Sequence, residues 1–329
     1  MKNLDIKDRK ILYALDMDAR QSDSEIAKKV RLSREAVRYR IAKLVENGYI
    51  NYFMTTLNSM KLGFDWYRTF FKFQNLSVEK EGEIISWLFG RVSWITKAEG
   101  KWDLNTGKFT KTVYEYRDFI NEFLLKYGEY IEAYNVAVVT RMWHYHRDYL
   151  LGKKEKSLKY ELMGFEEGTK YESQKIDKTD YKILSVLLKN ARMKTVDIAD
   201  RIGSTEMVVR YRIKKMRENG IILGFKPFLN MKKLEYMYFK VHFTLHNLTP
   251  QKKEGIMQYV HQHPNTVHTT ELVGGDDLET EFQVKSNEEF FEHIRDMRIR
   301  YGEIIREYFF MQYTDESKFS YLPEMEFKG

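Results

Sequence analysis

The chain consists of two copies of one unit, and this internal duplication constrains its fold more than any other feature. When the sequence is shifted by 172 positions, residues 5–50 align with residues 177–222 without a gap, and 20 of the 46 aligned residues are identical. The likeness weakens further on, but Tyr127-Gly128-Glu129 still matches Tyr301-Gly302-Glu303 at an offset of 174. The 329-residue chain is therefore predicted to fold as two similar units joined end to end.

Composition excludes several classes of protein. The chain has no cysteine, which excludes disulfides, thiolate metal sites and cysteine nucleophiles. It contains neither an apolar stretch long enough for a transmembrane helix nor a signal-peptide core at its start, so we expect a cytoplasmic protein without a membrane partner. Residues 1–52 carry a net charge of +4 and residues 175–226 carry +7, whereas the rest of the chain carries −4. Positive charge concentrated in the two matching segments favours a polyanionic partner.

The first 50 residues of each unit have the pattern of three short helices. Ser22-Asp23-Ser24-Glu25 has the form of a capping box that opens the second helix. Ser33 is the expected N-cap of the third helix, and Asn47-Gly48 ends it. Thr205 takes the same capping position in the second copy. A short turn between the second and third helices predicts a helix-turn-helix.

The remaining residues of each unit alternate between strand and helix patterns. In the first copy the predicted strands are 66–73, 92–98, 104–110 and 133–141, and the predicted helices are 78–89 and 116–127. In the second copy the strands are 238–245, 267–273, 279–284 and 306–313, and the helices are 253–261 and 288–301. The order βαββαβ indicates a ferredoxin-like sheet with two helices on one face. The aromatic side chains of Tyr67, Phe71, Phe73, Tyr238 and Phe243 are predicted to pack the other face against a second such sheet.

These motifs resemble the Lrp/AsnC (feast/famine) family of transcriptional regulators. The resemblance rests on Asp5, Asp8, Ile11-Leu12, Ala19-Arg20, Ile26-Ala27, Leu32-Ser33, Val37, Arg40-Ile41, Leu44, Gly48 and Ile50, which recur in large part in the second copy. Members of that family join a winged helix-turn-helix domain to a ferredoxin-like domain that senses a ligand. Ordinary members carry one unit per chain and dimerise, so this chain resembles such a dimer made covalent.

The resemblance implies an α+β fold with two repeats of this pair of domains. The expected boundaries are a first winged helix-turn-helix domain at 1–55, a first sensing domain at 56–150, a linker at 151–175, a second winged helix-turn-helix domain at 176–227 and a second sensing domain at 228–329. It also implies that chains associate further through their sensing domains.

The third helix of each copy is the expected DNA-reading element. On a helical wheel Val37, Ile41 and Leu44 form the inward stripe, and basic and tyrosine side chains lie on the other face. The predicted contacts to double-stranded DNA are Ser33, Arg34, Arg38, Tyr39 and Lys43 in the first copy and Thr205, Arg210, Tyr211, Lys214 and Lys215 in the second. Arg40 and Arg212 lie at the edge of the apolar stripe and are interpreted as partly structural, with a phosphate contact as the alternative.

A small effector such as an amino acid is the second expected partner. In the family such effectors bind near a Gly-x-aromatic-Asp turn, which matches Gly100, Trp102 and Asp103 in the first copy and, without the aromatic residue, Gly274, Asp276 and Asp277 in the second. An ordinary hairpin turn explains the same glycines and aspartates, and both interpretations stay open.

The sequence therefore predicts a sequence-specific transcriptional regulator that reads two half-sites. It predicts no enzyme activity, no catalytic residues, no cofactor and no metal, although His261, His263 and His268, and also His144 and His146, are close in sequence. The alternative is an enzyme that resembles the siroheme decarboxylases, which share this two-domain architecture. His144, His146 and Arg147 are the candidate residues for its tetrapyrrole site.

Overall fold

The computed structural model describes residues 4–152 and 159–327. In the first copy, helices α1 (Ile6–Met17), α2 (Asp23–Val30) and α3 (Arg34–Glu46) are followed by strand β1 (Ile50–Leu57). In the second copy, α6 (Lys178–Lys189), α7 (Thr195–Ile202) and α8 (Glu206–Glu218) are followed by β7 (Ile222–Leu229). Each set of three helices with its strand is one winged helix-turn-helix domain, as predicted.

Capping residues fix the ends of these helices. Ser22 and Glu25 form the predicted capping box at the start of α2. Ser33 accepts a hydrogen bond from the Ala36 amide at 3.1 Å, and Thr205 accepts one from the Val208 amide at 3.3 Å. Both predicted caps are therefore present, and they set the direction in which α3 and α8 leave the turn.

The two winged domains pack on each other with approximate twofold symmetry. Strands β1 and β7 pair antiparallel to form a two-stranded ribbon. Arg20 donates to the carbonyls of Ala191 and Met193 at 2.6 and 2.9 Å. Its counterpart Arg192 donates to the carbonyl oxygens of Ala19 at 2.5 Å and Gln21 at 3.2 Å. Reciprocal contacts of this kind are typical of an isologous dimer interface, here formed within one chain.

The other two domains supply the large sheet. In the first copy the elements are β2 (Asp65–Phe73), α4 (Val78–Phe89), β3 (Trp94–Gly100), β4 (Leu104–Thr110), α5 (Val113–Tyr127) and β5 (Ile131–Tyr145). In the second copy they are β8 (Met237–Leu245), α9 (Pro250–Gln262), β9 (Thr266–Val273), β10 (Leu278–Val284), α10 (Asn287–Tyr301) and β11 (Ile305–Phe319). Both copies have the predicted βαββαβ order. Short 3-10 helices lie at η1 (Ser59–Leu62), η2 (Gly128–Tyr130) and η3 (Asp148–Leu151).

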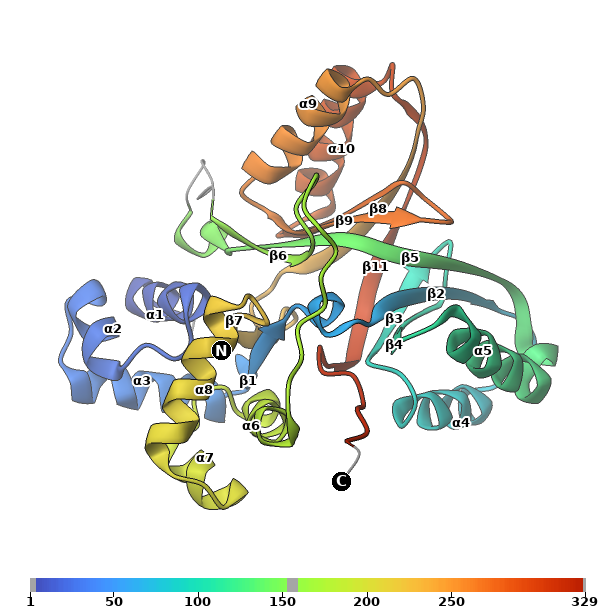
Figure 1. Ribbon diagram of the computed structural model, residues 1–329. Coiled ribbons are helices and arrows are strands. Elements are labelled where there is room, and N and C mark those ends of the chain that lie inside the picture. Colours follow the sequence, from blue (N-terminus) through green and yellow to red (C-terminus); the bar gives the residue numbers. More distant parts are fainter. Residues whose placement is uncertain (1–3, 153–158, 328–329) are drawn as a thin grey trace.

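The strands of the two copies form one continuous ring. Their order is β2-β4-β3-β11-β8-β10-β9-β5, and β5 also pairs with β2. The strands therefore enclose a common interior, with α4 and α5 outside one half of the ring and α9 and α10 outside the other (Figure 1). No helix among the described residues is long and apolar enough to span a bilayer.

Most of the aromatic residues predicted to face a second sheet lie on the opposite face, so that prediction is wrong for them. Tyr67, Phe71 and Phe73 pack with α4 and α5, and Phe243 packs with α9 and α10, so these residues point away from the second sheet. Successive residues of a strand point to opposite faces, and the alternate residues such as Trp66 and Phe70 therefore face the interior. Of the five aromatic residues predicted to face the other sheet, Tyr238 does so.

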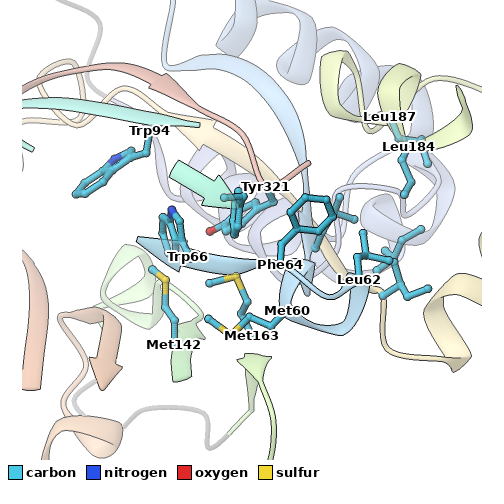
Figure 2. Packing of buried hydrophobic residues seen from close by; sticks show 14 of the residues in the cluster. Met60, Leu62, Phe64, Trp66, Trp94, Met142, Met163, Leu184, Leu187 and Tyr321 are labelled. Atoms are coloured by element: carbon cyan, nitrogen blue, oxygen red, sulfur yellow. The ribbon is translucent and has the colours of Figure 1, made fainter. Parts of the chain in front are cut away.

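The interior core continues out of the ring toward the second winged domain. Trp66 and Trp94 lie inside the strand ring. The core continues through Met60 and Leu62 of η1 and ends at Leu184 and Leu187 of α6 (Figure 2). The expected linker contributes a strand to this region, β6 (Tyr160–Gly164), which pairs with the last residues of β5. Residues 153–158 of that expected linker lie outside the described residues.

Candidate functional site

The predicted DNA-reading faces of α3 and α8 are open to solvent. On α3, Arg34, Arg38 and Lys43 are exposed, and Tyr39 is 64% exposed. On α8, Arg210, Lys214 and Lys215 are exposed, and Tyr211 is 62% exposed. Most of these cations have at most a weak surface partner, such as Glu206 at 2.6 Å from Arg210.

Arg40 and Arg212 hold each winged domain together. Arg40 bridges Asp5 and Asp8 at 2.8 and 2.7 Å, and its counterpart Arg212 bridges Asp177 and Asp180 at 2.7 and 3.0 Å. Each arginine thus ties the reading helix to the start of the first helix. These contacts match the structural interpretation of the two residues.

The two predicted effector turns are hairpin turns whose aspartates bind the protein itself. The Asp103 carboxylate accepts from the Phe73 amide and from Lys72, each at 2.7 Å. The Asp277 carboxylate accepts from the Leu245 amide at 2.7 Å.

The other predicted effector residues have structural roles in the turns. Gly100 and Gly274 have φ angles of 140° and 80°, which favour glycine, and the Trp102 side chain is buried. Asp276 contacts His242 and Thr244, each at 3.2 Å. These residues remain predicted effector contacts.

A large cavity lies elsewhere, between the β1–β7 ribbon and one end of the strand ring. Its volume is about 690 Å³, within the size range of small-molecule and cofactor sites. Apolar and aromatic side chains form much of its wall, among them Met54, Phe228, Tyr236, Phe319 and Tyr321. Residues from both winged domains and both ferredoxin-like domains therefore contribute to one site.

Two histidines lie side by side in the wall of this cavity. His144 of β5 pairs in register with His268 of β9, and their ring centroids are 4.8 Å apart. The Tyr321 hydroxyl lies 3.3 Å from His144 Nδ1, and His268 Nδ1 is buried with no hydrogen-bond partner in the described part of the chain. Burial holds the pKa of His144 well below its usual value, and His268 and Lys226 lower it further. Burial and the nearby Arg147 act in the same way on the pKa of His268.

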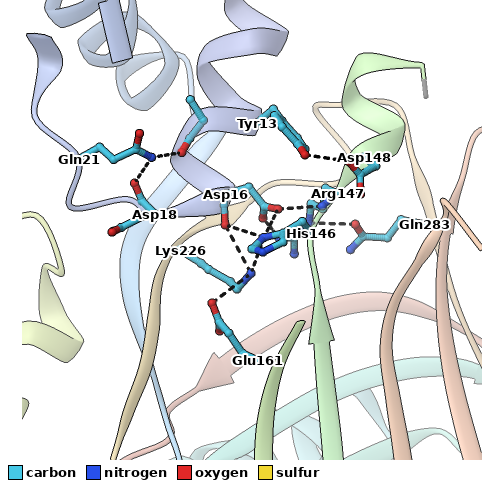
Figure 3. Close-up of polar contacts among 11 residues, drawn as sticks. Tyr13, Asp16, Asp18, Gln21, His146, Arg147, Asp148, Glu161, Lys226 and Gln283 are labelled. Atoms are coloured by element: carbon cyan, nitrogen blue, oxygen red, sulfur yellow. Dashed lines mark hydrogen bonds and ion pairs between the residues drawn. The ribbon is translucent and has the colours of Figure 1, made fainter. Parts of the chain in front are cut away.

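A group of charged residues borders the cavity, and Figure 3 shows the contacts among them. Asp16 of α1 is fully buried and binds the Arg147 guanidinium at 2.5 Å and the Arg147 amide at 2.8 Å. Burial alone would raise the pKa of Asp16, but Lys226 and Arg147 outweigh it and hold that pKa far below its usual range.

Lys226 of β7 connects this group to β6. Its ammonium lies 3.5 Å from the Glu161 carboxylate, 3.4 Å from His146 Nδ1 and 3.4 Å from the Asp16 carbonyl. We call Asp16, His146, Arg147, Glu161 and Lys226 the charged cluster. Arg147 and Lys226 line the cavity, so the cluster places two buried cations where a ligand carboxylate could meet them.

The charged cluster exists on one side of the pseudo-twofold axis. Asp16, Arg147 and Lys226 correspond to Leu188, Tyr321 and Met54. These three residues line a second cavity of about 510 Å³, and Met54 and Tyr321 lie in the walls of both cavities. The positions equivalent to His144 and His268 hold Lys318 and Trp94. The two copies have therefore diverged at this position, and the histidines and cations lie in one of the two related sites.

Sequence reasoning found part of this site. It named His144, His146 and Arg147 as tetrapyrrole candidates, and the structure places all three in or beside the cavity. It missed Asp16 and Lys226, which are 131 and 79 residues away from Arg147 along the chain. Among the residues that the structure describes, no three acidic or histidine side chains converge as metal ligands.

Comparisons with known proteins agree with the duplicated architecture. A family model described as winged helix-turn-helix DNA-binding matches residues 4–51 and 176–222. The HTH-type transcriptional regulator LrpA of Pyrococcus horikoshii is 44% identical over 61 residues, which are 18% of this chain and 43% of that protein. The chain therefore carries two winged helix-turn-helix domains, and their sequence is similar to that of Lrp-type regulators. This confirms the resemblance found in the sequence.

A second Lrp-type relative matches most of one unit. The regulator LrpB of Bacillus subtilis is 26% identical over 127 residues, which are 39% of this chain and 83% of that protein. The chain spans less than half the length of the first curated relatives that it matches.

Solved structures of the siroheme decarboxylase NirDL are similar to nearly the whole chain. One has a TM-score of 0.62 at 15% identity and covers 97% of this chain and 94% of that chain. A second, in complex with an iron-uroporphyrin III analogue, has a TM-score of 0.61 and covers 95% and 92%. At this identity the likeness establishes the fold, and it confirms the tandem α+β architecture.

Proposed function

We propose that this protein is a decarboxylase that removes carboxyl groups, as CO₂, from side chains of an iron tetrapyrrole of the siroheme type. The observation that carries the proposal is that His144 and His268 lie side by side in a large cavity that Arg147 and Lys226 also line. The fold match to NirDL over nearly the whole chain supports the same activity. The proposal departs from the sequence-based expectation that the chain is no enzyme.

The cavity suits a flat apolar ring that carries acidic groups. Met54, Phe228, Tyr236 and Phe319 can pack against the faces of a macrocycle. Arg147 and Lys226 can bind carboxylates at its edge, and a guanidinium can hold a carboxylate through two parallel hydrogen bonds.

Decarboxylation requires a proton and no oxidant. For an acetate side chain the balance is R–CH₂–COO⁻ + H⁺ → R–CH₃ + CO₂. The bond to the carboxyl carbon breaks, its electron pair stays on the methylene carbon and is spread into the macrocycle, and a proton then forms the new C–H bond. The protein must therefore hold the other carboxylates in place and supply one proton for each CO₂ released.

His144 and His268 are the groups that we assign to the reacting side chain. Both are neutral in the resting protein, so each can donate one ring N–H and accept a proton at the other nitrogen. The Tyr321 hydroxyl, 3.3 Å from His144 Nδ1, holds the orientation of that ring. Arg147 and Lys226 bind the carboxylates that are retained.

The test is to incubate the purified protein with siroheme under anaerobic conditions and follow the tetrapyrrole by mass spectrometry. Wild type should lose the mass of one CO₂ per reacting side chain. Replacing His144→Asn and His268→Asn should slow this loss about 100-fold or more, the usual effect of removing an acid–base group. His263→Asn is the control, because His263 Nε2 lies 2.8 Å from His293 and outside the cavity. Folded wild-type protein that binds siroheme without releasing CO₂ would overturn the proposal.

We propose DNA binding as a second candidate function, supported by the exposed basic faces of α3 and α8. Arg38 and Arg210 occupy equivalent positions on the two helices, and both are exposed. Reading helices that are free to enter a major groove are the feature shared by helix-turn-helix regulators. Selection of bound fragments from random duplexes tests this function, with recovery of one imperfectly palindromic site as the expected result and no enrichment as the refuting one.

A further inference from the structure

A row of polar residues crosses the buried interior of the strand ring on the side of the second copy. Alternate residues of a strand point to one face, and the inward residues of β8 and β10 are polar. They are Tyr238, Lys240 and His242 on β8, and Glu279, Glu281 and Gln283 on β10. Apart from Tyr238, which is half-buried, all of them are buried.

The row begins at the cavity. Tyr238 lines the cavity, and its hydroxyl donates to the Glu281 carboxylate at 2.5 Å. The Lys240 ammonium lies 3.1 Å from Glu281 and 2.6 Å from Glu279. Tyr313 of β11 also lines the cavity, and its hydroxyl lies 3.4 Å from Glu281.

The row ends at the surface turn between β9 and β10. Nδ1 of His242 lies 3.6 Å from the Glu279 carboxylate and 3.2 Å from the Asp276 carboxylate. The Asp276 side chain is 14% exposed and accepts from the Thr244 hydroxyl at 3.2 Å. The groups from Tyr238 to Asp276 therefore form a row of proton donors and acceptors from the cavity to solvent. The 3.6 Å separation of Glu279 and His242 is longer than a hydrogen bond, so transfer at that step requires the two groups to move closer together.

The first copy provides an internal comparison. The positions of Tyr238, Lys240 and His242 hold Trp66, Arg68 and Phe70 there, and those of Glu279 and Glu281 hold Asn105 and Gly107. Four of these five residues cannot exchange a proton at neutral pH, and the fifth is the permanently charged Arg68. Arg68 pairs with Glu279 across the interior and stacks on Trp66 at 4.5 Å. The same fold is thus built with few titratable groups in the first copy.

Burying charged groups in a sheet interior is costly, and their replacement by packed apolar residues is often neutral or stabilising. The first copy shows that largely apolar residues are accommodated at these positions. Glu279 also balances the buried charge of Arg68, but that pair requires neither Lys240 nor His242. The second copy therefore buries Lys240, His242 and Glu281, in a row that opens on the cavity, beyond what the Arg68 charge requires.

We propose that this row is a proton relay that carries protons from solvent at Asp276 to the cavity at Tyr238. The proposal rests on the proposed function, because each decarboxylation consumes one proton inside a cavity that a bound macrocycle would fill. Tyr238, Glu281, Lys240, Glu279, His242 and Asp276 are the members of the relay.

The transfers balance without any further reactant. Tyr238 gives its hydroxyl proton to the acid–base group of the cavity that protonates the methylene carbon. Lys240 returns a proton to the tyrosinate through Glu281, and His242 and Asp276 recharge Lys240 through Glu279 with a proton from solvent. Burial raises the pKa of Tyr238 well above its usual value, so the hydroxyl is protonated at rest. Burial would raise the pKa of Glu281, but Lys240 and Arg68 outweigh it and keep the carboxylate ready to accept.

The experiment compares single-turnover decarboxylation of siroheme by wild type, Glu281→Gln and His242→Phe in H₂O and D₂O. His242→Phe introduces the residue of the first copy, and the ring already lies between Phe70 and Phe309 at 5.0 and 4.4 Å, so the variant should fold. We expect each variant to be at least about tenfold slower and to show a larger solvent isotope effect. Binding of iron-uroporphyrin III should stay within about twofold of wild type, because neither residue touches the ligand. Glu271→Gln, which changes a β9 carboxylate 2.6 Å from Arg141 and outside the row, is the matched control.

Three outcomes would overturn the relay. Wild-type rates and isotope effects in both variants would show that protons reach the cavity by another route. A loss of rate that follows a loss of ligand binding or thermal stability, with an unchanged isotope effect, would show a structural role. Wild-type protein that binds siroheme without decarboxylating it would overturn the proposed function and the relay together, which separates that failure from the first two.

Discussion

The charged cluster makes a prediction in which stability and ligand binding change in opposite directions. Replacing Asp16→Asn keeps the shape of the side chain and removes the charge that faces Arg147 and Lys226. Breaking a buried ion pair by removing one partner costs about 3–5 kcal/mol, because the other charge is left buried. Glu161 remains 3.5 Å from Lys226, and Gln283 still accepts from Arg147 at 3.1 Å. We therefore expect the lower end, a loss of about 3 kcal/mol.

The same change should strengthen binding of an anionic tetrapyrrole. Asp16 competes with ligand carboxylates for Arg147, and Asp16→Asn frees that guanidinium. The assays are thermal unfolding, urea unfolding for the free-energy difference, and absorbance titration with iron-uroporphyrin III. The expected result is a fall in Tm of roughly 6 °C or more together with several-fold tighter binding.

The lowered pKa of Asp16 predicts how the difference in free energy of unfolding between wild type and Asp16→Asn changes with pH. A carboxylate with a folded-state pKa below its unfolded value contributes stability above the unfolded pKa and loses it as the pH falls. The difference between wild type and Asp16→Asn should therefore be constant above pH 3.8, the ordinary pKa of the group, and narrow below it. Asp18→Asn is the control, because the partly exposed Asp18 is 3.9 Å from its cationic partner Arg217. Unchanged stability in Asp16→Asn, or weaker ligand binding, would refute the reasoning.

Three further predictions concern other parts of the molecule. Replacing Arg38→Ala or Arg210→Ala should cost about 1–3 kcal/mol of DNA affinity in gel-shift titrations, and an equal affinity for both variants and wild type at low salt would count against DNA reading by these helices. Burial raises the pKa of Glu316 in the cavity wall to about 7, so binding of iron-uroporphyrin III should tighten as the pH falls through that value, and Glu316→Gln should remove this dependence. A Cβ at Gly107 would lie 2.5 Å from Trp66 Nε1, so Gly107→Ala should lower the free energy of unfolding by about 1–3 kcal/mol, whereas Gly82→Ala, where nothing lies within 4 Å, should not lower it.

Much of the fold could be predicted because local signals and tertiary packing agree. Ser22 and Glu25 formed the predicted capping box, and 78–89 and 104–110 are a helix and a strand with those bounds in the structure. Because the chain is duplicated, each helix and strand could be predicted twice, once from each copy of the unit. Where a predicted helix or strand differs from the observed one, the difference lies in its terminal residues, because tertiary packing rather than local sequence determines where an element ends.

Which face of β2 points to the interior could not be predicted, because both faces of the strand are buried. A strand with one solvent-exposed face alternates apolar and polar residues, but six consecutive residues of β2, Trp66-Tyr67-Arg68-Thr69-Phe70-Phe71, are all buried. A register error of one residue then exchanges the two faces without any visible conflict. The polar row of β8 and β10 was missed for a related reason, because alternating polar residues are typical of a solvent-facing strand.

The site could be predicted only in part because its residues come from distant segments. His144 and Arg147 lie close together in the sequence, whereas Asp16 and Lys226 reach them through the packing of α1 and β7 on the strand ring. Sequence reasoning identified the basic faces of α3 and α8 through their surface charge. It had no comparable signal for buried charges whose partners are more than 70 residues away.

Joining the two units in one polypeptide has a consequence for ligand stoichiometry. A homodimer of identical chains would present every interface site twice, and a substitution would alter both. Here Leu188, Tyr321 and Met54 occupy the positions related to Asp16, Arg147 and Lys226, so one site is free to become apolar while the other keeps its charges. Each polypeptide should accordingly take up a single tetrapyrrole with a hyperbolic saturation curve, where a symmetric pair would take up two.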